Sequence, residues 1–80
     1  NDFCFDAASE YIYGGNFIDK KIEKFPVSGR IDPVDEYSCL GYPGYLSMLD
    51  GQILCVSFSR QQQRAYSYNA GILIEKIDID

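Results

Sequence analysis

The stretch YLSMLDGQILCVSFS, residues 45–59, indicates the class of fold. Asp50-Gly51 stands between two apolar runs, and such a dipeptide favours the positive backbone angles of a tight hairpin turn. The second arm alternates with a period of two, as a β-strand does. The two faces that this period predicts are Leu54, Val56 and Phe58 on one side and Ile53, Cys55 and Ser57 on the other.

Segments of β type also precede this hairpin. In residues 2–6, DFCFD, the two phenylalanines share one predicted face and Cys4 lies on the other with the aspartates. The apolar patch at 11–13 follows, and Gly14-Gly15 predicts a two-residue hairpin turn because glycine adopts positive φ without strain. The first part of the chain therefore predicts a second hairpin.

The last predicted strand, residues 72–79, carries two pairs of isoleucines with opposite parity. Ile72 and Ile74 share one face, whereas Ile77 and Ile79 fall on the other. A β-bulge near residues 75–76 would turn all four toward the core. With this strand, the chain has five or six short strands at the spacing that is typical of small sandwiches and barrels.

Residues 16–25, NFIDKKIEKF, fit two kinds of secondary structure. As a strand, the segment alternates between Ile18, Lys20 and Ile22 on one face and charged or aromatic residues on the other. As a helix, Ile18, Ile22 and Phe25 fall at i, i+4 and i+7, which is one helical face. The segment follows a hairpin signal and is short for a helix, so the strand is favoured and the helix stays open.

Composition limits the kind of protein that this is. Eighty residues form a single domain over 1–80, and 46% hydrophobic residues are too many for a disordered chain. The absence of histidine excludes Ser-His-Asp and Cys-His catalysis, and a net charge of −5 disfavours nucleic acid and anionic membranes. No apolar run approaches 18 residues, and the acidic groups at 32–36 and 78–80 lack ligand spacing. We therefore expect a non-enzyme without cofactor or metal.

The three cysteines, Cys4, Cys39 and Cys55, make an odd set. Three pairings are possible, and Cys4–Cys39 is favoured because Cys55 lies in an apolar alternating strand, where a buried thiol behaves as a small hydrophobe. That bridge would close a loop of 36 residues and contribute about 4 kcal/mol to stability. A first residue other than Met fits a secreted protein whose signal peptide has been removed, a setting that permits a disulfide.

Tyrosine is the residue type that best suits contact with a partner. The chain has seven, and each offers apolar area with a polar tip, although tyrosine also suits the half-exposed faces of a small sheet protein. The residues singled out for contact are Tyr11, Tyr13, Tyr66 and Tyr68. If residues 16–24 form an edge strand, Ile18, Lys20 and Ile22 would join them at the contact.

The stretch CLGYPGYLSMLDGQIL, residues 39–54, resembles the MAX effectors, the Magnaporthe avirulence and ToxB-like proteins that plant-pathogenic fungi secrete. The resemblance rests on one cysteine in the first strand, at Cys4, and a second about 35 residues later, at Cys39, directly before Tyr42-Pro43 and a hairpin. In length and strand count it covers the whole chain.

The resemblance implies an all-β fold, a six-stranded antiparallel β-sandwich of two three-stranded sheets. It carries one disulfide over to Cys4 and Cys39, between the first strand and the region before the fifth. It also implies a secreted, non-catalytic virulence or avirulence effector that acts inside or around plant cells by binding a host protein, such as a heavy-metal-associated domain of an immune receptor. We expect such an effector to be a monomer.

Two other classes of protein remain open. A ribonuclease-like effector packs a helix on a sheet, and residues 16–25 could be that helix. Without histidine it would be a pseudoenzyme. A small inhibitor or immunity protein also fits the size and the acidic charge, but in a cytosol its cysteines would stay reduced.

Overall fold

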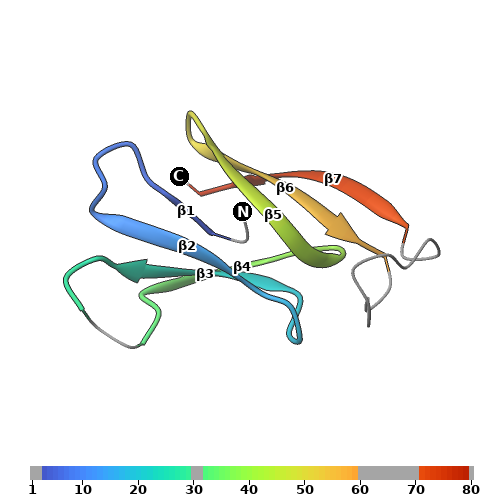
Figure 1. Ribbon diagram of the computed structural model, residues 1–80, viewed down its shortest axis with the longest axis horizontal. Coiled ribbons are helices and arrows are strands. Elements are labelled where there is room, and N and C mark those ends of the chain that lie inside the picture. The colour runs from blue at the N-terminus through green and yellow to red at the C-terminus, as the bar shows by residue number, and fades with distance from the viewer. Residues whose placement is uncertain (1–2, 30–31, 60–70, 80) are drawn as a thin grey trace.

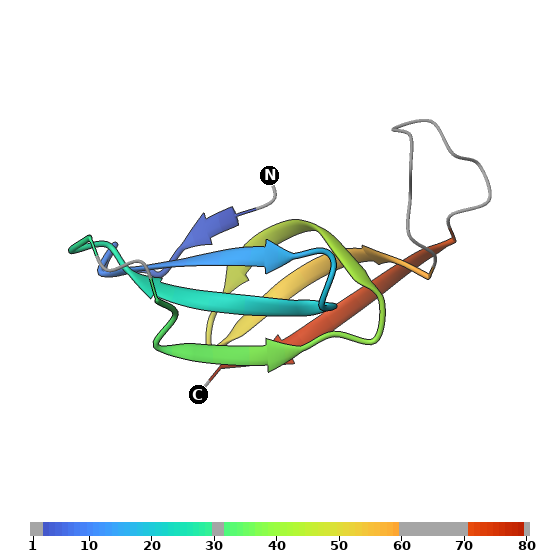
Figure 2. The same cartoon turned by 90° about the horizontal axis from the view of Figure 1, so that it is seen from below.

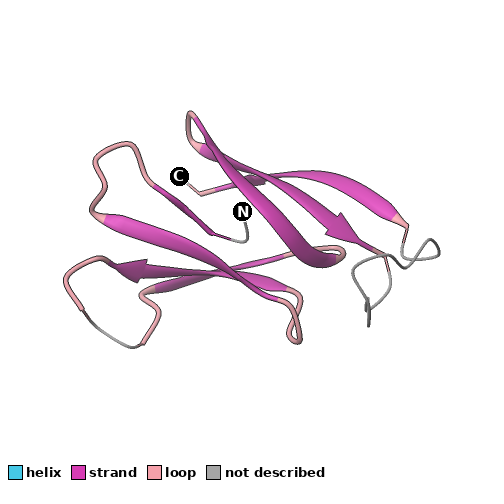
Figure 3. Cartoon of the chain, in the orientation of Figure 1, coloured by secondary structure: helices cyan, strands magenta, loops and turns pink. Residues whose placement is uncertain are grey.

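The computed structural model describes residues 3–29, 32–59 and 71–79, and in these ranges the chain forms strands and no helix (Figures 1 and 3). The strands are β1 (Phe3–Phe5), β2 (Tyr11–Asn16), β3 (Lys21–Pro26), β4 (Asp35–Ser38), β5 (Tyr42–Leu49), β6 (Gln52–Phe58) and β7 (Ile72–Asp78). They form two antiparallel sheets with the orders β1-β2-β3-β4 and β5-β6-β7. The all-β prediction is confirmed.

The prediction of six strands in two three-stranded sheets is wrong, since the described residues form a sheet of four strands and a sheet of three. Strand β4 is not among the predicted strands, and its residues DEYS are mostly polar and exposed. It pairs with β3 through Lys21↔Ser38 and Lys24↔Asp35, and the Lys21 ammonium lies 2.9 Å from the Glu36 carboxylate. A polar edge strand of this kind lacks the apolar alternation on which the prediction relied.

The hairpin predicted over 45–59 is confirmed. Leu49 and Gln52 are paired across the turn, and Gly51 adopts the positive φ of 73° that the turn requires. A register shift between Pro43 and Tyr45 marks a bulge at Gly44. A Cβ on Gly44 would lie 2.6 Å from the Phe58 ring, so only glycine fits there.

The turn predicted at Gly14-Gly15 is wrong, because both glycines lie inside β2. The chain reverses at 17–20 instead, where the Asn16 side chain accepts a hydrogen bond from the Asp19 N–H at 3.1 Å and Lys20 adopts a positive φ of 54°. A Cβ on Gly15 would meet Pro43 of β5 at 3.2 Å. Gly15 therefore allows the two sheets to approach closely. Residues 16–25 form the end of β2, a turn and most of β3, so the alternative of a helix there is wrong.

The bulge predicted near residues 75–76 is also absent, since β6 and β7 keep one register from Gln52↔Asp78 to Phe58↔Ile72. Leu73, Glu75 and Ile77 therefore face the interior, and Ile72 and Ile74 face outward. A carboxylate is tolerated on the inner side because its oxygens accept hydrogen bonds, as described below.

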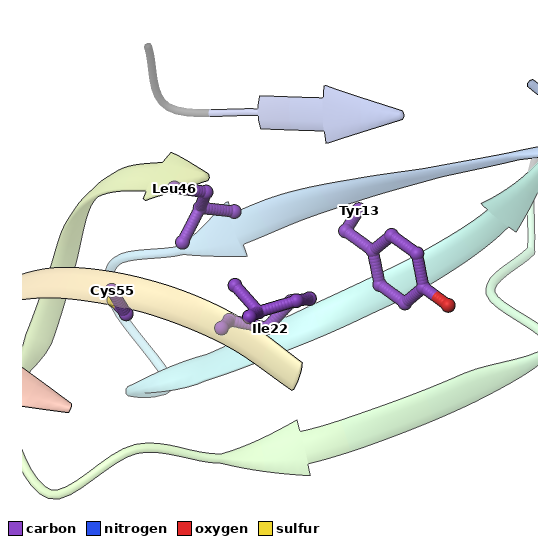
Figure 4. Packing of buried hydrophobic residues seen from close by; sticks show 5 residues of the cluster. Tyr13, Ile22, Leu46 and Cys55 are labelled. Carbon is purple, nitrogen blue, oxygen red and sulfur yellow. The ribbon is translucent and has the colours of Figure 1, made fainter. Parts of the chain in front are cut away.

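The core lies between the two sheets. Five fully or nearly fully buried apolar side chains come from four strands of both sheets: Tyr13, Ile22, Leu46, Ile53 and Cys55 (Figure 4). Within the three-stranded sheet, β5 is the strand that makes most of the contacts with the other sheet, chiefly with β1 and β2. Figure 2 shows the end of β6 and the start of β7 extending beyond the four-stranded sheet. The side of the β5-β6-β7 sheet that faces away from the four-stranded sheet lies outside the core.

Candidate functional site

The side of the β5-β6-β7 sheet that faces away from the core carries an apolar patch, while Ser47, Gln52, Lys76 and Asp78 lie on the same side toward the β5–β6 hairpin. We call the patch the outer face, and it consists of Tyr45, Leu54, Val56, Phe58, Ile72 and Ile74. The residues Tyr45, Val56 and Ile74 lie directly opposite one another across the three strands. Side chains in such a row are neighbours, so the outer face is one continuous surface.

Three of these side chains are strongly exposed. Relative exposure is 60% for Tyr45, 68% for Ile72 and 65% for Ile74, while Leu54, Val56 and Phe58 are half-buried among them. Single exposed apolar residues are ordinary, but a contiguous apolar area is typical of a surface that contacts a partner.

The outer face borders an open sheet edge. The Ile79 N–H donates to the Gly51 carbonyl at 3.2 Å and the Ser59 N–H donates to the Gly71 carbonyl at 3.1 Å, so the odd-numbered residues of β7 bond to β6. The even-numbered residues, including Ile72 and Ile74, direct their N–H and C=O groups to the other side. Among the described strands, only β6 pairs with β7.

A polar network lies on the inner side of the same sheet, around Glu75. Its carboxylate accepts hydrogen bonds from the Leu40 N–H at 2.8 Å, the Gly41 N–H at 3.2 Å and the Ser57 hydroxyl. Partial burial raises the pKa of the Glu75 carboxyl, but these donors outweigh burial and hold the pKa below its usual value. The carboxylate therefore stays ionised and ties the β4–β5 connection to β6 and β7, which is a structural role.

Two of the residues predicted to contact a partner, Tyr13 and Ile22, lie in the core at 3% and 0% exposure. This placement corrects the prediction for both, because their apolar surface is already covered by the opposite sheet. Tyr11 is half-buried, and the Lys24 Nζ lies 4.2 Å from the centre of its ring. That ring face is therefore occupied by a cation–π contact.

Ile18 and Lys20, the other two predicted contact residues, lie in the β2–β3 turn. Ile18 is 79% exposed, and the Lys20 Nζ lies 5.0 Å from the centre of the Tyr42 ring, which also packs against Phe17. The predicted edge strand over 16–24 is wrong, since β3 lies between β2 and β4. Tyr66 and Tyr68, the remaining residues predicted to contact a partner, lie outside the described residues.

The outer face is not among the predicted sites, because the predicted bulge would turn Ile72 and Ile74 toward the core. The signal was present in the opposite parity of Ile72 and Ile77 around Glu75. In a strand without a bulge, a carboxylate on the inner side requires the isoleucines of the other parity to face solvent.

The predicted Cys4–Cys39 disulfide is not formed in the structure, where all three cysteines are free thiols. Cys39 instead packs against the core cluster that contains Cys55. The interaction between the two thiols, together with burial, raises the pKa of Cys39, and the same interaction lowers the pKa of Cys55. The described residues contain no group of three side chains placed to hold a metal ion.

Comparisons with protein-family models, with curated proteins and with solved structures each give no match to this chain. Within the described ranges, no helix is long and apolar enough to cross a membrane. The resemblance at residues 39–54 accordingly remains a prediction.

Proposed function

We propose that this protein is a secreted, non-catalytic effector of a plant-pathogenic fungus, and that it binds a host protein through the outer face. The observation that carries the binding role is the continuous apolar surface on the side of the β5-β6-β7 sheet away from the core. An apolar sheet face of this extent leaves unfavourable contact with water, which a partner would remove.

The outer face has the composition of a binding surface. Tyr45 combines a large apolar ring with a hydroxyl, and Ile72 and Ile74 add aliphatic area at its side. Lys76 and Asp78 follow on the same face of β7 and supply a charged rim. An apolar centre with a polar rim is the usual arrangement at protein interfaces.

The open edge of β7 adds a second means of recognition. A partner strand that paired there would bond to the free N–H and C=O groups of the even-numbered residues, while its own side chains met Ile72 and Ile74. The edge therefore favours a partner with an exposed strand of its own.

The resemblance to the MAX effectors supports the class of partner. It implies a host protein such as a heavy-metal-associated domain of a plant immune receptor, bound by a monomeric effector that acts in or around plant cells. The all-β fold with two packed antiparallel sheets agrees with that class in kind, although the strand count differs from the one it implies.

The test is a binding titration with a panel of purified heavy-metal-associated domains from plant immune receptors. We expect one or more to bind the intact protein, and we expect Ile74→Ser to weaken that binding about tenfold, since truncating a central apolar contact costs more than about 1 kcal/mol. Ile18→Ser, at a site of similar exposure in the β2–β3 turn, is the matched control and should bind as the parent does.

Two results would contradict the proposal. If no domain of the panel binds, the class of partner is wrong. If Ile18→Ser weakens binding and Ile74→Ser does not, the partner contacts the β2–β3 turn, and the outer face is not the site. Circular dichroism of both variants confirms that the comparison is made between folded proteins.

A further inference from the structure

Cys39 is held in place by hydrogen bonds of its own amide and of the next one. The Cys39 N–H donates to the Lys20 carbonyl at 2.9 Å, and the Leu40 N–H donates to the Glu75 carboxylate at 2.8 Å. Glu75 is the Cα partner of Cys55 across β6 and β7. The chain at Cys39 is therefore fixed against the inner side of the β5-β6-β7 sheet, at the level of Cys55.

The side chains of these two cysteines are in contact. Cys39 packs against the core cluster that contains Cys55, and the two thiols lie close enough for each to shift the pKa of the other. Cys4, in β1, packs against the same cluster from the other sheet. Burial is the largest cause of the raised pKa of Cys4, and Cys55 also raises it.

All three cysteines thus belong to the same core cluster or pack against it, and they differ in their access to solvent. Cys55 is fully buried, whereas Cys39 and Cys4 are partly exposed. Only a thiol with some access to solvent can meet a dissolved oxidant, and the buried thiol can then react with its neighbour.

We propose that Cys39 and Cys55 are the pair that forms a disulfide on oxidation, and that Cys4 remains a thiol. This site does not depend on the proposed function, since it concerns the chemistry of the chain alone. It differs from the Cys4–Cys39 bridge that the sequence favoured, because it uses the cysteine that was assigned to the core.

With oxidised glutathione as the oxidant, the reaction has two steps. The partly exposed Cys39 thiol loses its proton and attacks as the thiolate on one sulfur of the oxidant, which gives a mixed disulfide and releases one glutathione thiolate that takes up a proton. The Cys55 thiolate then attacks the Cys39 sulfur and releases the second glutathione. Two protein thiols are oxidised to one disulfide, and one oxidised glutathione is reduced to two glutathiones.

The bond would join the β4–β5 connection to β6 and close a loop of 17 residues, from 39 to 55. Closing a loop of this length restricts the unfolded chain. We expect the thermal midpoint of the oxidised protein to lie roughly 10–20 °C above that of the reduced protein.

The experiment maps the bond after oxidation with a glutathione buffer, with free thiols blocked by alkylation. Cyanogen bromide cuts after Met48, the only methionine, and separates 1–48 from 49–80. A Cys39–Cys55 bond keeps these fragments together until a reductant is added. Trypsin leaves both cysteines in the fragment 31–60, which should be about 2 Da lighter than its reduced form, while the fragment 1–20 carries one alkyl group on Cys4.

Variants complete the test. Cys4→Ser should still form the bond and keep the increase in thermal midpoint, whereas Cys39→Ser should not form it. Because Cys39→Ser leaves the fully buried position intact, it avoids a variant that fails to fold. A bond that links the tryptic fragments 1–20 and 31–60 in the parent protein, or fragments 1–48 and 49–80 that separate without reductant, would overturn the proposal.

Discussion

Ser57 of β6 donates its hydroxyl hydrogen to the carboxylate of Glu75 on β7, on the inner side of the β5-β6-β7 sheet. Ser57 is fully buried, and Glu75 also accepts the amide hydrogens of Leu40 and Gly41. The hydrogen bond between these two polar side chains therefore compensates for their position on the inner side of the sheet. They also fix which side of β7 faces the core.

Removal of this hydroxyl should destabilise the fold. We expect Ser57→Ala to lower the free energy of unfolding by about 1–2 kcal/mol, because a hydrogen bond to a partly buried charged group is lost. Urea denaturation followed by circular dichroism measures the change. Ser47→Ala, at an exposed position of β5, is the control and should change stability by less than about 0.5 kcal/mol. Equal effects of the two substitutions would show that the Ser57 bond contributes nothing.

Stability should depend on pH through Glu75. Because its pKa is lower in the folded protein than in the unfolded chain, its contribution is present above the ordinary value of 4.5 and is lost as pH falls through the folded pKa. We expect Glu75→Gln to be less stable than the parent at about pH 7, and the difference to shrink toward about pH 3. Urea midpoints measured across this range provide the check, and a difference that stays constant contradicts the assignment.

The two sides of the β5-β6-β7 sheet should respond differently to truncation. Ile53 is fully buried in the core, so Ile53→Ala should cost about 2–5 kcal/mol of folding free energy. Ile74, on the outer face, is 65% exposed, and Ile74→Ala should cost less than about 0.5 kcal/mol. Thermal unfolding of both variants measures the contrast. A large loss for Ile74→Ala would mean that the outer face is covered in the free protein.

Alanine substitutions at Gly44 and Gly14 should have different effects on the free energy of unfolding. A Cβ on Gly44 would lie 2.6 Å from the Phe58 ring and 2.9 Å from the Val56 carbonyl oxygen, whereas a Cβ on Gly14 meets nothing within 4 Å. We expect Gly44→Ala to cost about 1–3 kcal/mol. Gly14→Ala should be neutral or stabilise by up to about 1 kcal/mol, since it restricts the unfolded chain. Chemical denaturation of the two variants compares them, and a similar loss in both would refute the role assigned to the bulge.

Local patterns predicted the parts of the fold that local forces decide. Asp50-Gly51 between two alternating runs defines the β5–β6 hairpin because the turn and the period of two act within a few residues. Residues 16–25 form strands and a turn and not a helix, because the segment is short and lies in the hairpin of β2 and β3. The polar edge strand β4 has no such signal, because pairing with β3 and not its own side chains makes it a strand.

The local patterns did not predict the candidate site. Tyr13 and Ile22 look like contact residues in the sequence, but the packing of one sheet on the other covers them. Ile72 and Ile74 look like core residues in the sequence. The three hydrogen bonds that the Glu75 carboxylate accepts instead hold the odd-numbered side of β7 toward the core, so the two isoleucines face outward. A strand pattern defines two faces and does not say which one a second sheet will cover.

The sequence by itself thus determined an all-β domain, the hairpin at Asp50-Gly51 and the alternation of each strand, because these depend on neighbours in the chain. Only the tertiary structure decided that Gly15 serves sheet packing, that Cys39 meets Cys55 and that the outer face is left open. These features depend on contacts between residues far apart in the chain, and local preference carries no information about such contacts.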